Sequence, residues 1–237
     1  MRVSTVSSFG LCGMFALSGV LLPSAAAAQT KAYPPMAEYL MPRDAEIALA
    51  RSAAPDAISS RASVKVLASS GFEMAATGDN GFTCVVLRGW SAPSFTPVKM
   101  RGLVYDAKLR APICYDPVAS RTILPMQELR TKLAIAGKDP DAIAHEVAAA
   151  YTRGTLPKTE GVSFAYMWSA KQYLGEAAGA WHPHMMIYAP YYTNAMLGGN
   201  AFGSTAPFVS EDEGTPYAIV VVAVHGNEAI SGGPGSH

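Results

Sequence analysis

The chain has 237 residues, and its 18 lysines and arginines are balanced by 18 aspartates and glutamates, so the formal net charge is zero. A nucleic-acid-binding domain usually carries a basic excess, and a protein held at an anionic membrane surface usually carries a polybasic run. The balanced charge therefore supports neither class of partner, while a hydrophobic content of 50% is enough to build a substantial core.

Residues 1–28 have the pattern of a secretory signal peptide. Arg2 supplies a positive start, residues 9–22 are apolar, and Ala26 and Ala28 are the small residues that signal peptidase prefers. The apolar run is about 14 residues long, which is shorter than the roughly 20 that a transmembrane helix needs. We expect cleavage after Ala28, a periplasmic or extracellular location, and no membrane span in the mature chain.

Two cysteines follow the signal peptide, Cys84 and Cys114. In an oxidising compartment an isolated pair forms a structural disulfide by default, and closing a loop of about 30 residues stabilises a fold by roughly 3–4 kcal/mol. Two buried thiols are the alternative. A reversible redox pair is less favoured, because the spacing is not the C-x-x-C of thiol oxidoreductases. We therefore predict a Cys84–Cys114 disulfide.

The first part of the mature chain predicts one helix followed by three strands. Residues 29–41 are expected to be extended, and a helix should begin near Pro42, end before Pro55 and expose Glu46 to solvent. Glycine-containing turns then separate three strand candidates, which we expect to pair as a β-meander: residues 64–68, 72–76 and 82–88.

The middle of the chain predicts a helical hairpin. Residues 89–121 are proline-spaced and irregular, with one strand candidate at 103–105. Pro125 opens a helix that Gly137 ends, and Asp139 caps a second helix. Because the connection is only about three residues long, the two helices should pack as antiparallel neighbours.

The last third predicts further strands and is rich in aromatic residues. Phe164, Tyr166 and Trp168 alternate, as expected for one face of a strand. The remaining segments are strands at 184–189 and 217–224, a long loop at 193–216, and a mobile glycine-rich tail at 226–237.

The order of these elements predicts the fold class α+β. We expect residues 29–237 to form a single exported domain, because no internal repeat and no linker divides them. Its sheet should be mainly antiparallel, in two groups of about three strands, with the helical hairpin between the groups.

The motif Trp-His-Pro-His at residues 181–184 is the most chemically suggestive. His182 and His184 lie two apart in an extended segment, so both imidazoles point to one side and can share a transition-metal ion such as zinc. A tight site needs three or four ligands. Further candidates are His225, if the last strand lies alongside, Glu176 and Glu228. Such a centre indicates a metal-dependent hydrolase or oxidoreductase, and purely structural roles for the histidines are the alternative.

Aromatic residues suggest a second kind of site, because tyrosine and tryptophan combine an apolar face with a polar tip. The expected ligand contacts are Trp181, Tyr188, Tyr191 and Tyr192. The alternation at 164–168 instead favours core packing. The leading hypothesis is a ligand-binding or envelope accessory domain whose partner is a small molecule or an envelope protein, and the metal-dependent enzyme is the alternative.

Overall fold

The computed structural model describes residues 32–91, 104–175, 183–200, 206–210, 213–215 and 218–224, all within one unit, Ala32–His237. The predicted signal peptide and the tail at 226–237 lie outside these residues. In the described part of the chain, no helix is both long enough and apolar enough to cross a bilayer.

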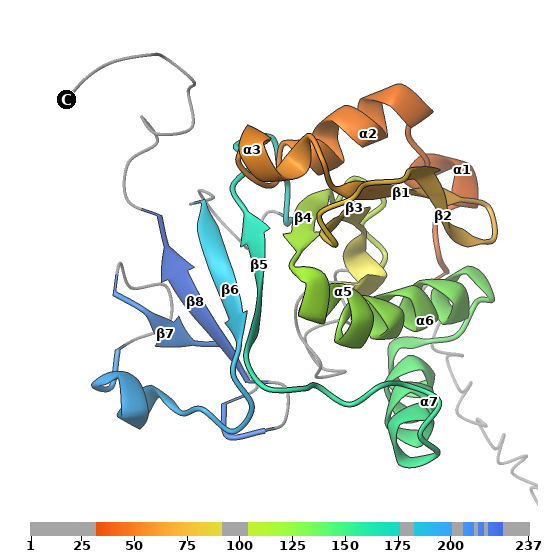
Figure 1. Ribbon diagram of the computed structural model, residues 1–237. Helices are drawn as coiled ribbons and strands as arrows, with labels where there is room; N and C mark the ends of the chain where they lie inside the picture. The colour runs from red at the N-terminus through yellow and green to blue at the C-terminus, as the bar shows by residue number, and fades with distance from the viewer. Residues whose placement is uncertain are drawn as a thin grey trace, which may run out of the picture. The chain divides into compact units, whose positions relative to one another are not determined.

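One eight-stranded sheet organises the described part of the chain (Figure 1). The strand order is β2-β1-β3-β4-β5-β6-β8-β7, and every neighbouring pair is antiparallel except β1 and β3. The strands are β1 (Ser63–Ala68), β2 (Gly71–Ala76), β3 (Thr83–Leu87), β4 (Ala111–Tyr115), β5 (Ser163–Met167), β6 (His184–Tyr188), β7 (Phe208–Val209) and β8 (Ile219–Ala223). A mixed α/β architecture with a largely antiparallel sheet agrees with the prediction in outline, but the two expected groups of strands are halves of one sheet.

The predicted β-meander is wrong at its third strand. β1 and β2 form the expected hairpin, but β3 pairs with β1 in parallel, with Ser63 opposite Thr83 and Val64 opposite Cys84. The reason lies in burial: β2 exposes Glu73 and Met74, as an edge strand does, whereas the last four residues of β3 are buried. A strand that is apolar on both faces needs cover on both, and in the middle of this sheet α2 (Arg43–Arg51) covers one face while α5 (Pro117–Thr122) and α6 (Leu124–Ile135) cover the other.

β4 was not predicted, and the strand expected at 103–105 is wrong, because Val104 and Tyr105 lie in a turn. All five residues of β4 are buried, and Pro112 stands in its middle, opposite Val86 of β3. Proline cannot donate to a β-ladder, so sequence reasoning argues against a central strand there. The two-residue strand β7 also falls inside the segment predicted as a loop.

Three helices, α2, α6 and α7, begin and end close to their sequence signals, whereas α3 and α5 were not predicted. Asp139 caps α7, accepting a hydrogen bond from the Ala142 N–H at 2.8 Å, and α6 and α7 are neighbours as the hairpin requires. The segment 29–41, expected to be extended, contains a short helix instead. The helices are α1 (Met36–Tyr39), α2 (Arg43–Arg51), α3 (Asp56–Ser59), α5 (Pro117–Thr122), α6 (Leu124–Ile135) and α7 (Pro140–Thr152).

Helices lie on both sides of the sheet (Figure 1). The α2 face carries Val64, Cys84, Cys114 and Tyr166, and the alanines of α2 and the following turn pack on it. The α6 face carries Tyr115, Ala165, Met186 and Val221, and residues of α5 and α6 contribute to the same core cluster. Side chains alternate between these faces along each strand, so the register of the strands decides which residues meet.

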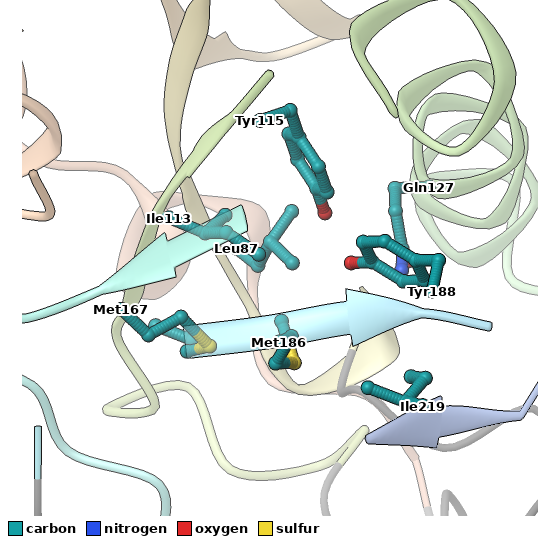
Figure 2. A pocket seen from close by; sticks show the side chains of 9 residues that line it. Leu87, Ile113, Tyr115, Gln127, Met167, Met186, Tyr188 and Ile219 are labelled. Carbon is teal, nitrogen blue, oxygen red and sulfur yellow. The ribbon is translucent and has the colours of Figure 1, made fainter. Parts of the chain in front are cut away.

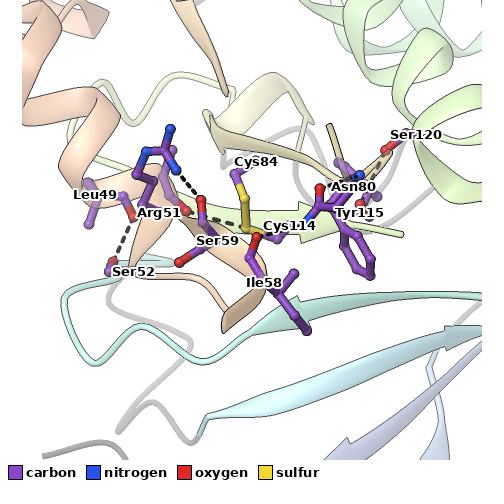
Figure 3. Close-up of a disulfide and its surroundings, with 12 residues drawn as sticks. Leu49, Arg51, Ser52, Ile58, Ser59, Asn80, Cys84, Cys114, Tyr115 and Ser120 are labelled. Carbon is purple, nitrogen blue, oxygen red and sulfur yellow. Dashed lines mark hydrogen bonds between the residues drawn. A yellow bond between two sulfur atoms is a disulfide. The ribbon is translucent and has the colours of Figure 1, made fainter. Parts of the chain in front are cut away.

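The predicted disulfide is confirmed (Figure 3). Cys84 and Cys114 are direct register partners on β3 and β4, with their Cα atoms 4.0 Å apart. Neither residue exposes any surface to solvent. The bond therefore joins two central strands beneath α2 and is structural.

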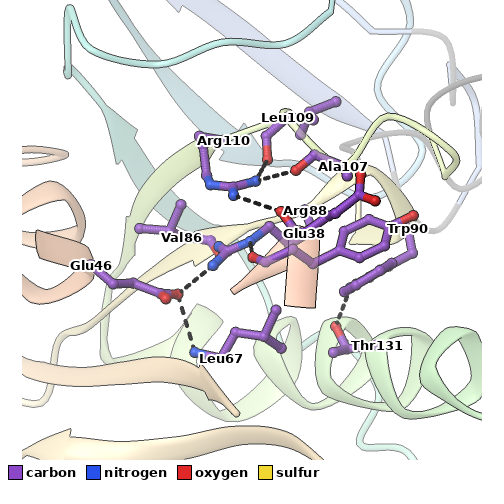
Figure 4. Close-up of polar contacts among 11 residues, drawn as sticks. Glu38, Glu46, Leu67, Val86, Arg88, Trp90, Ala107, Leu109, Arg110 and Thr131 are labelled. Carbon is purple, nitrogen blue, oxygen red and sulfur yellow. Dashed lines mark hydrogen bonds and ion pairs between the residues drawn. The ribbon is translucent and has the colours of Figure 1, made fainter. Parts of the chain in front are cut away.

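The expectation that Glu46 is solvated is wrong, because this residue is fully buried in an ion pair with Arg88 (Figure 4). Arg88 Nη2 lies 2.9 Å from Glu46 Oε1, and the same oxygen accepts the Leu67 N–H at 3.1 Å. Arg88 Nε donates to the Tyr39 carbonyl at 2.8 Å. The pair thus connects α2, β1, the residue after β3 and the end of α1.

The contact between the two charges is an ion pair and not a linear hydrogen bond. Glu46 Oε2 and Arg88 Nη2 have no hydrogen-bond partner among the described residues. Burial lowers the pKa of Arg88 to about 10, while the Glu46 carboxylate acts to raise it. Arg88 therefore stays charged at neutral pH, inside the core, with one carboxylate to balance it.

Glu46→Gln should reduce the free energy of unfolding by about 3–5 kcal/mol, because it leaves the Arg88 charge buried without a counter-charge. The measurement is urea unfolding of the oxidised protein, followed by tryptophan fluorescence. Asp79→Asn is the matched control, since it removes an exposed carboxylate that pairs with Arg61 at 3.0 Å. Its stability should equal that of the wild type, and equal losses in both variants would contradict the buried-pair interpretation.

Candidate functional site

His184 is the only predicted metal ligand within the described residues, because His182 and His225 both lie outside them, as does Trp181. It is half-buried at the start of β6. The condition set for His225 is met: β8 lies alongside β6, with Ala223 opposite His184. The ladder continues one step further, since the Val224 N–H donates to the Pro183 carbonyl at 2.9 Å.

Two methionines share the α6 face with His184. Met167, the last residue of β5, is its direct register partner, and Met186 lies two residues further along β6. Direct cross-strand partners have Cβ atoms about 4.5–5.5 Å apart, within the reach of long side chains. Sequence reasoning missed both methionines, although the even spacing of His184 and Met186 already places them on one side of their strand.

A small cavity lies between the sheet and α6 (Figure 2). The space open to the centre of a water-sized sphere is about 10 Å³, close to the roughly 10–15 Å³ that one water molecule requires. The wall is mostly apolar and includes both methionines. The lining residues are Leu87, Ala111, Ile113, Tyr115, Gln127, Met167, Met186, Tyr188 and Ile219.

Two tyrosines and a glutamine supply the polar atoms of the cavity. The rings of Tyr115 and Tyr188 are stacked, with centroids 6.4 Å apart and planes 29° from parallel. Burial raises the pKa of both phenols well above the ordinary value, so both stay neutral. The Tyr115 and Tyr188 hydroxyls interact with each other, whereas Gln127 Oε1 has no hydrogen-bond partner among the described residues and is the polar atom that could receive a small occupant.

The tyrosines predicted as ligand contacts do not lie together. Tyr188 is 3% exposed and lines the cavity in the core, away from the other two tyrosines at the surface. Tyr191 and Tyr192 are 61% and 41% exposed. Tyr191 has a φ of 66°, a left-handed conformation that costs a bulky residue on the order of 1–3 kcal/mol.

Backbone hydrogen bonds hold this exposed pair in place. The Tyr191 N–H donates to the Thr215 carbonyl at 2.8 Å, and the Gly214 N–H donates to the Tyr192 carbonyl at 2.8 Å. Two residues after Tyr192, the Asn194 N–H donates to Glu213 Oε1 at 2.6 Å. The loop is therefore tied to the segment before β8 while it displays both rings.

The alternating aromatic residues of β5 pack as the sequence suggested. Tyr166 meets Phe164 and Trp168 edge to face, with interplanar angles of 90° and 89°. Rings at right angles to one another pack edge against face and form no single flat surface. Phe164 and Tyr166 lie on the α2 face of β5, on the opposite side of the sheet from Met167 and Met186.

Within the described ranges, no group of three or more histidines, cysteines, aspartates or glutamates could hold a metal ion. The register partners of His184 are Met167 on β5 and Ala223 on β8. Comparison with protein-family models, with curated proteins and with solved structures gave no significant match. The function has to be inferred from the chain's own residues.

The buried tyrosines predict a loss of stability in alkali. Their folded pKa values lie above the value of about 10 in an unfolded chain, so the unfolded state loses its protons first as the pH rises. The free energy of unfolding should be unaffected below about pH 9 and fall above about pH 10. Tyr115→Phe/Tyr188→Phe should lose less stability over that interval than the wild type.

The control for this comparison is Tyr191→Phe, which changes an exposed ring and should leave the pH dependence as it is in the wild type. Urea unfolding at a series of pH values gives the stability, and ultraviolet absorbance of tyrosinate shows when each phenol ionises. Ionisation of both buried phenols in the folded protein near pH 10 would contradict the burial argument.

Proposed function

We propose that the protein is an exported metal-binding domain that holds one transition-metal ion beside His184, at the start of β6. The observation that supports this most is the pairing of β6 with β8. It places Ala223 opposite His184 and hydrogen-bonds Val224 to Pro183. These last two residues are the chain neighbours of His225 and His182.

Histidines at these three positions suit one ion. Residues on successive even steps of a strand share a face, and partners in an antiparallel ladder stand side by side. In the sequence, His182 stands two residues before His184 and His225 directly follows Val224, and both lie outside the described residues. Three neutral imidazoles are a common ligand set for zinc and copper.

Metal binding is proposed here in preference to metal-assisted hydrolysis. A hydrolytic centre needs an open coordination position and a nearby group that takes or gives a proton. The register neighbours of His184 on the α6 face include Met167 and Met186, whose thioether sulfur atoms can bind a soft metal ion but cannot take or give a proton. These two side chains support ion binding.

Export is part of the same proposal. The first 28 residues have the pattern of a signal peptide, and a buried disulfide between Cys84 and Cys114 is compatible with an oxidising compartment. A binding domain outside the cytoplasm would meet metal ions without the competition of cytosolic thiols.

Metal content tests the proposal. The precursor is expressed with its signal sequence, and the mature form is purified from the exported fraction without an affinity tag and analysed by mass spectrometry. About one equivalent of a transition metal is expected in the wild type and should be lost in His182→Ala/His184→Ala. His145→Ala, which changes an exposed histidine on α7, should keep the metal. No metal uptake by the wild type, even after incubation with zinc and copper salts, would refute the proposal.

A second candidate function is favoured by one observation, the exposed and left-handed Tyr191. An aromatic side chain held in a costly conformation at the surface is a feature of binding sites, and tyrosine is enriched at protein interfaces. The partner would be an envelope protein that covers Tyr191 and Tyr192.

The test is photocrosslinking from position 192 in the exporting cell, with position 173 as the control because Tyr173 is 37% exposed. A product specific to position 192 is expected. Added wild-type protein should compete it away, and Tyr191→Ala/Tyr192→Ala should not. Equal crosslinking from both positions would count against this candidate.

A further inference from the structure

We infer that the ion held beside His184 is a soft monovalent cation, Cu(I), bound by the thioether sulfur atoms of Met167 and Met186 together with the His184 imidazole. This inference rests on the proposed function and names the class of ion that the same site takes. It uses three residues that the structure describes.

The strand register brings these three side chains together. Met167 stands opposite His184 across the β5–β6 pair, and Met186 follows His184 by two residues on the same strand. The Cβ atoms of Met167 and His184 are expected to lie about 4.5–5.5 Å apart, and those of His184 and Met186 about 7 Å apart. The three Cβ atoms thus form a triangle on the α6 face, with sides that flexible side chains can close around one ion.

Burial agrees with this arrangement. Met167 and Met186 are 1% and 3% exposed, and His184 is half-buried. Both methionines also line the small cavity in Figure 2, whereas His184 is not among its lining residues, so the cavity is not itself the ion site. Methionine has three rotatable bonds and a polarizable sulfur, so both side chains can turn toward an ion beside His184 at little cost.

The chemistry of the ligands selects the metal. Thioether sulfur is a soft ligand that favours Cu(I), whereas carboxylates and water favour hard cations. The three ligands are neutral, and the residues that line the cavity with the methionines are mostly apolar, as Leu87 and Ile113 are, and none is charged. Burying a charge in apolar surroundings is costly and costs more for a divalent ion than for a monovalent one. A neutral soft site in the core therefore favours Cu(I) over Zn(II).

The plain alternative is that the two methionines only fill the core. Metal ligands and core residues would both be buried at these positions. A measurement of stability alone therefore does not distinguish the two interpretations. Methionine to leucine is a volume-conserving change that usually costs less than about 1.5 kcal/mol, so the variant should fold. It removes the sulfur atom and keeps the packing, which separates a ligand from a filler.

The experiment measures Cu(I) and Zn(II) affinities of the untagged mature protein by competition with chromophoric chelators, with Cu(I) kept reduced by ascorbate. Met167→Leu/Met186→Leu should weaken Cu(I) binding by about 10–100-fold, as loss of supporting groups does in other metal sites, and leave any Zn(II) affinity unchanged. Met185→Leu is the matched control, because Met185 is on the same strand but is the register partner of Tyr166, on the α2 face. X-ray absorption of the Cu(I) form should show sulfur neighbours in the wild type and lose them in the double variant.

The outcomes separate this inference from the proposed function. If the wild type and the double variant bind Cu(I) with equal affinity, the two methionines are not ligands. That result would overturn this inference and leave the metal-binding function standing. A wild type that takes up neither Cu(I) nor Zn(II) would overturn the function and the inference with it. Loss of Cu(I) binding in the Met185→Leu control as well would show a general packing effect and would also overturn the inference.

Discussion

The buried ion pair between Glu46 and Arg88 is the constraint on which the rest of the packing depends. Moving two charges out of water costs several kcal/mol per ion, and their attraction offsets this cost only while they stay in contact. Any arrangement that moved α2 away from β3 would leave one charge alone in the core. The pair therefore specifies the docking of α2, and through the Tyr39 carbonyl it also fixes where α1 ends. The net contribution of the ion pair to the free energy of unfolding is a different quantity from this specificity. An apolar pair of equal volume could hold the same elements together with equal stability.

The ion pair fixes one half of the sheet, and β4 connects it to the other half because it pairs with β3 on one side and with β5 on the other. Tyr115 pairs with Ala165 of β5, and Ala165 pairs with Met186 of β6, so the register of each strand depends on the one before it. β5 separates two roles by its faces: Tyr166 packs beneath the helical cover of the α2 face, while Met167 turns to the α6 face. The candidate metal ligands thus lie on the side of the sheet that also holds the cavity, and the aromatic residues Phe164, Tyr166 and Trp168 pack against one another on the other side.

Features that depend on neighbouring residues in the sequence were predicted well. Features that depend on contacts between distant segments were missed. Asp139 before a proline marks a helix start by its own chemistry, and alternation along 163–167 marks a strand, so both were found. Pro112 hid β4, because the missing N–H of a proline usually excludes a central strand. Glu46 looked solvated because its partner comes from a distant strand, and a helix with several charges does not reveal which one turns inward. The meeting of Met167 with His184 depends on the register between two strands, which neither strand's own sequence contains.

The disulfide has a consequence for the order of events during maturation. Cys84 and Cys114 have no exposed surface, and the alanines of α2 lie over them. Thiol–disulfide exchange proceeds by direct attack of a thiolate on sulfur, so an oxidant or a reductant has to reach the sulfur atoms. The bond must therefore form in the interval before α2 docks, while the two strands are still open on that side. Once α2 has docked, it shields the two sulfur atoms from reducing agents. The folded protein therefore keeps the disulfide that formed during folding, even if the surroundings later become reducing.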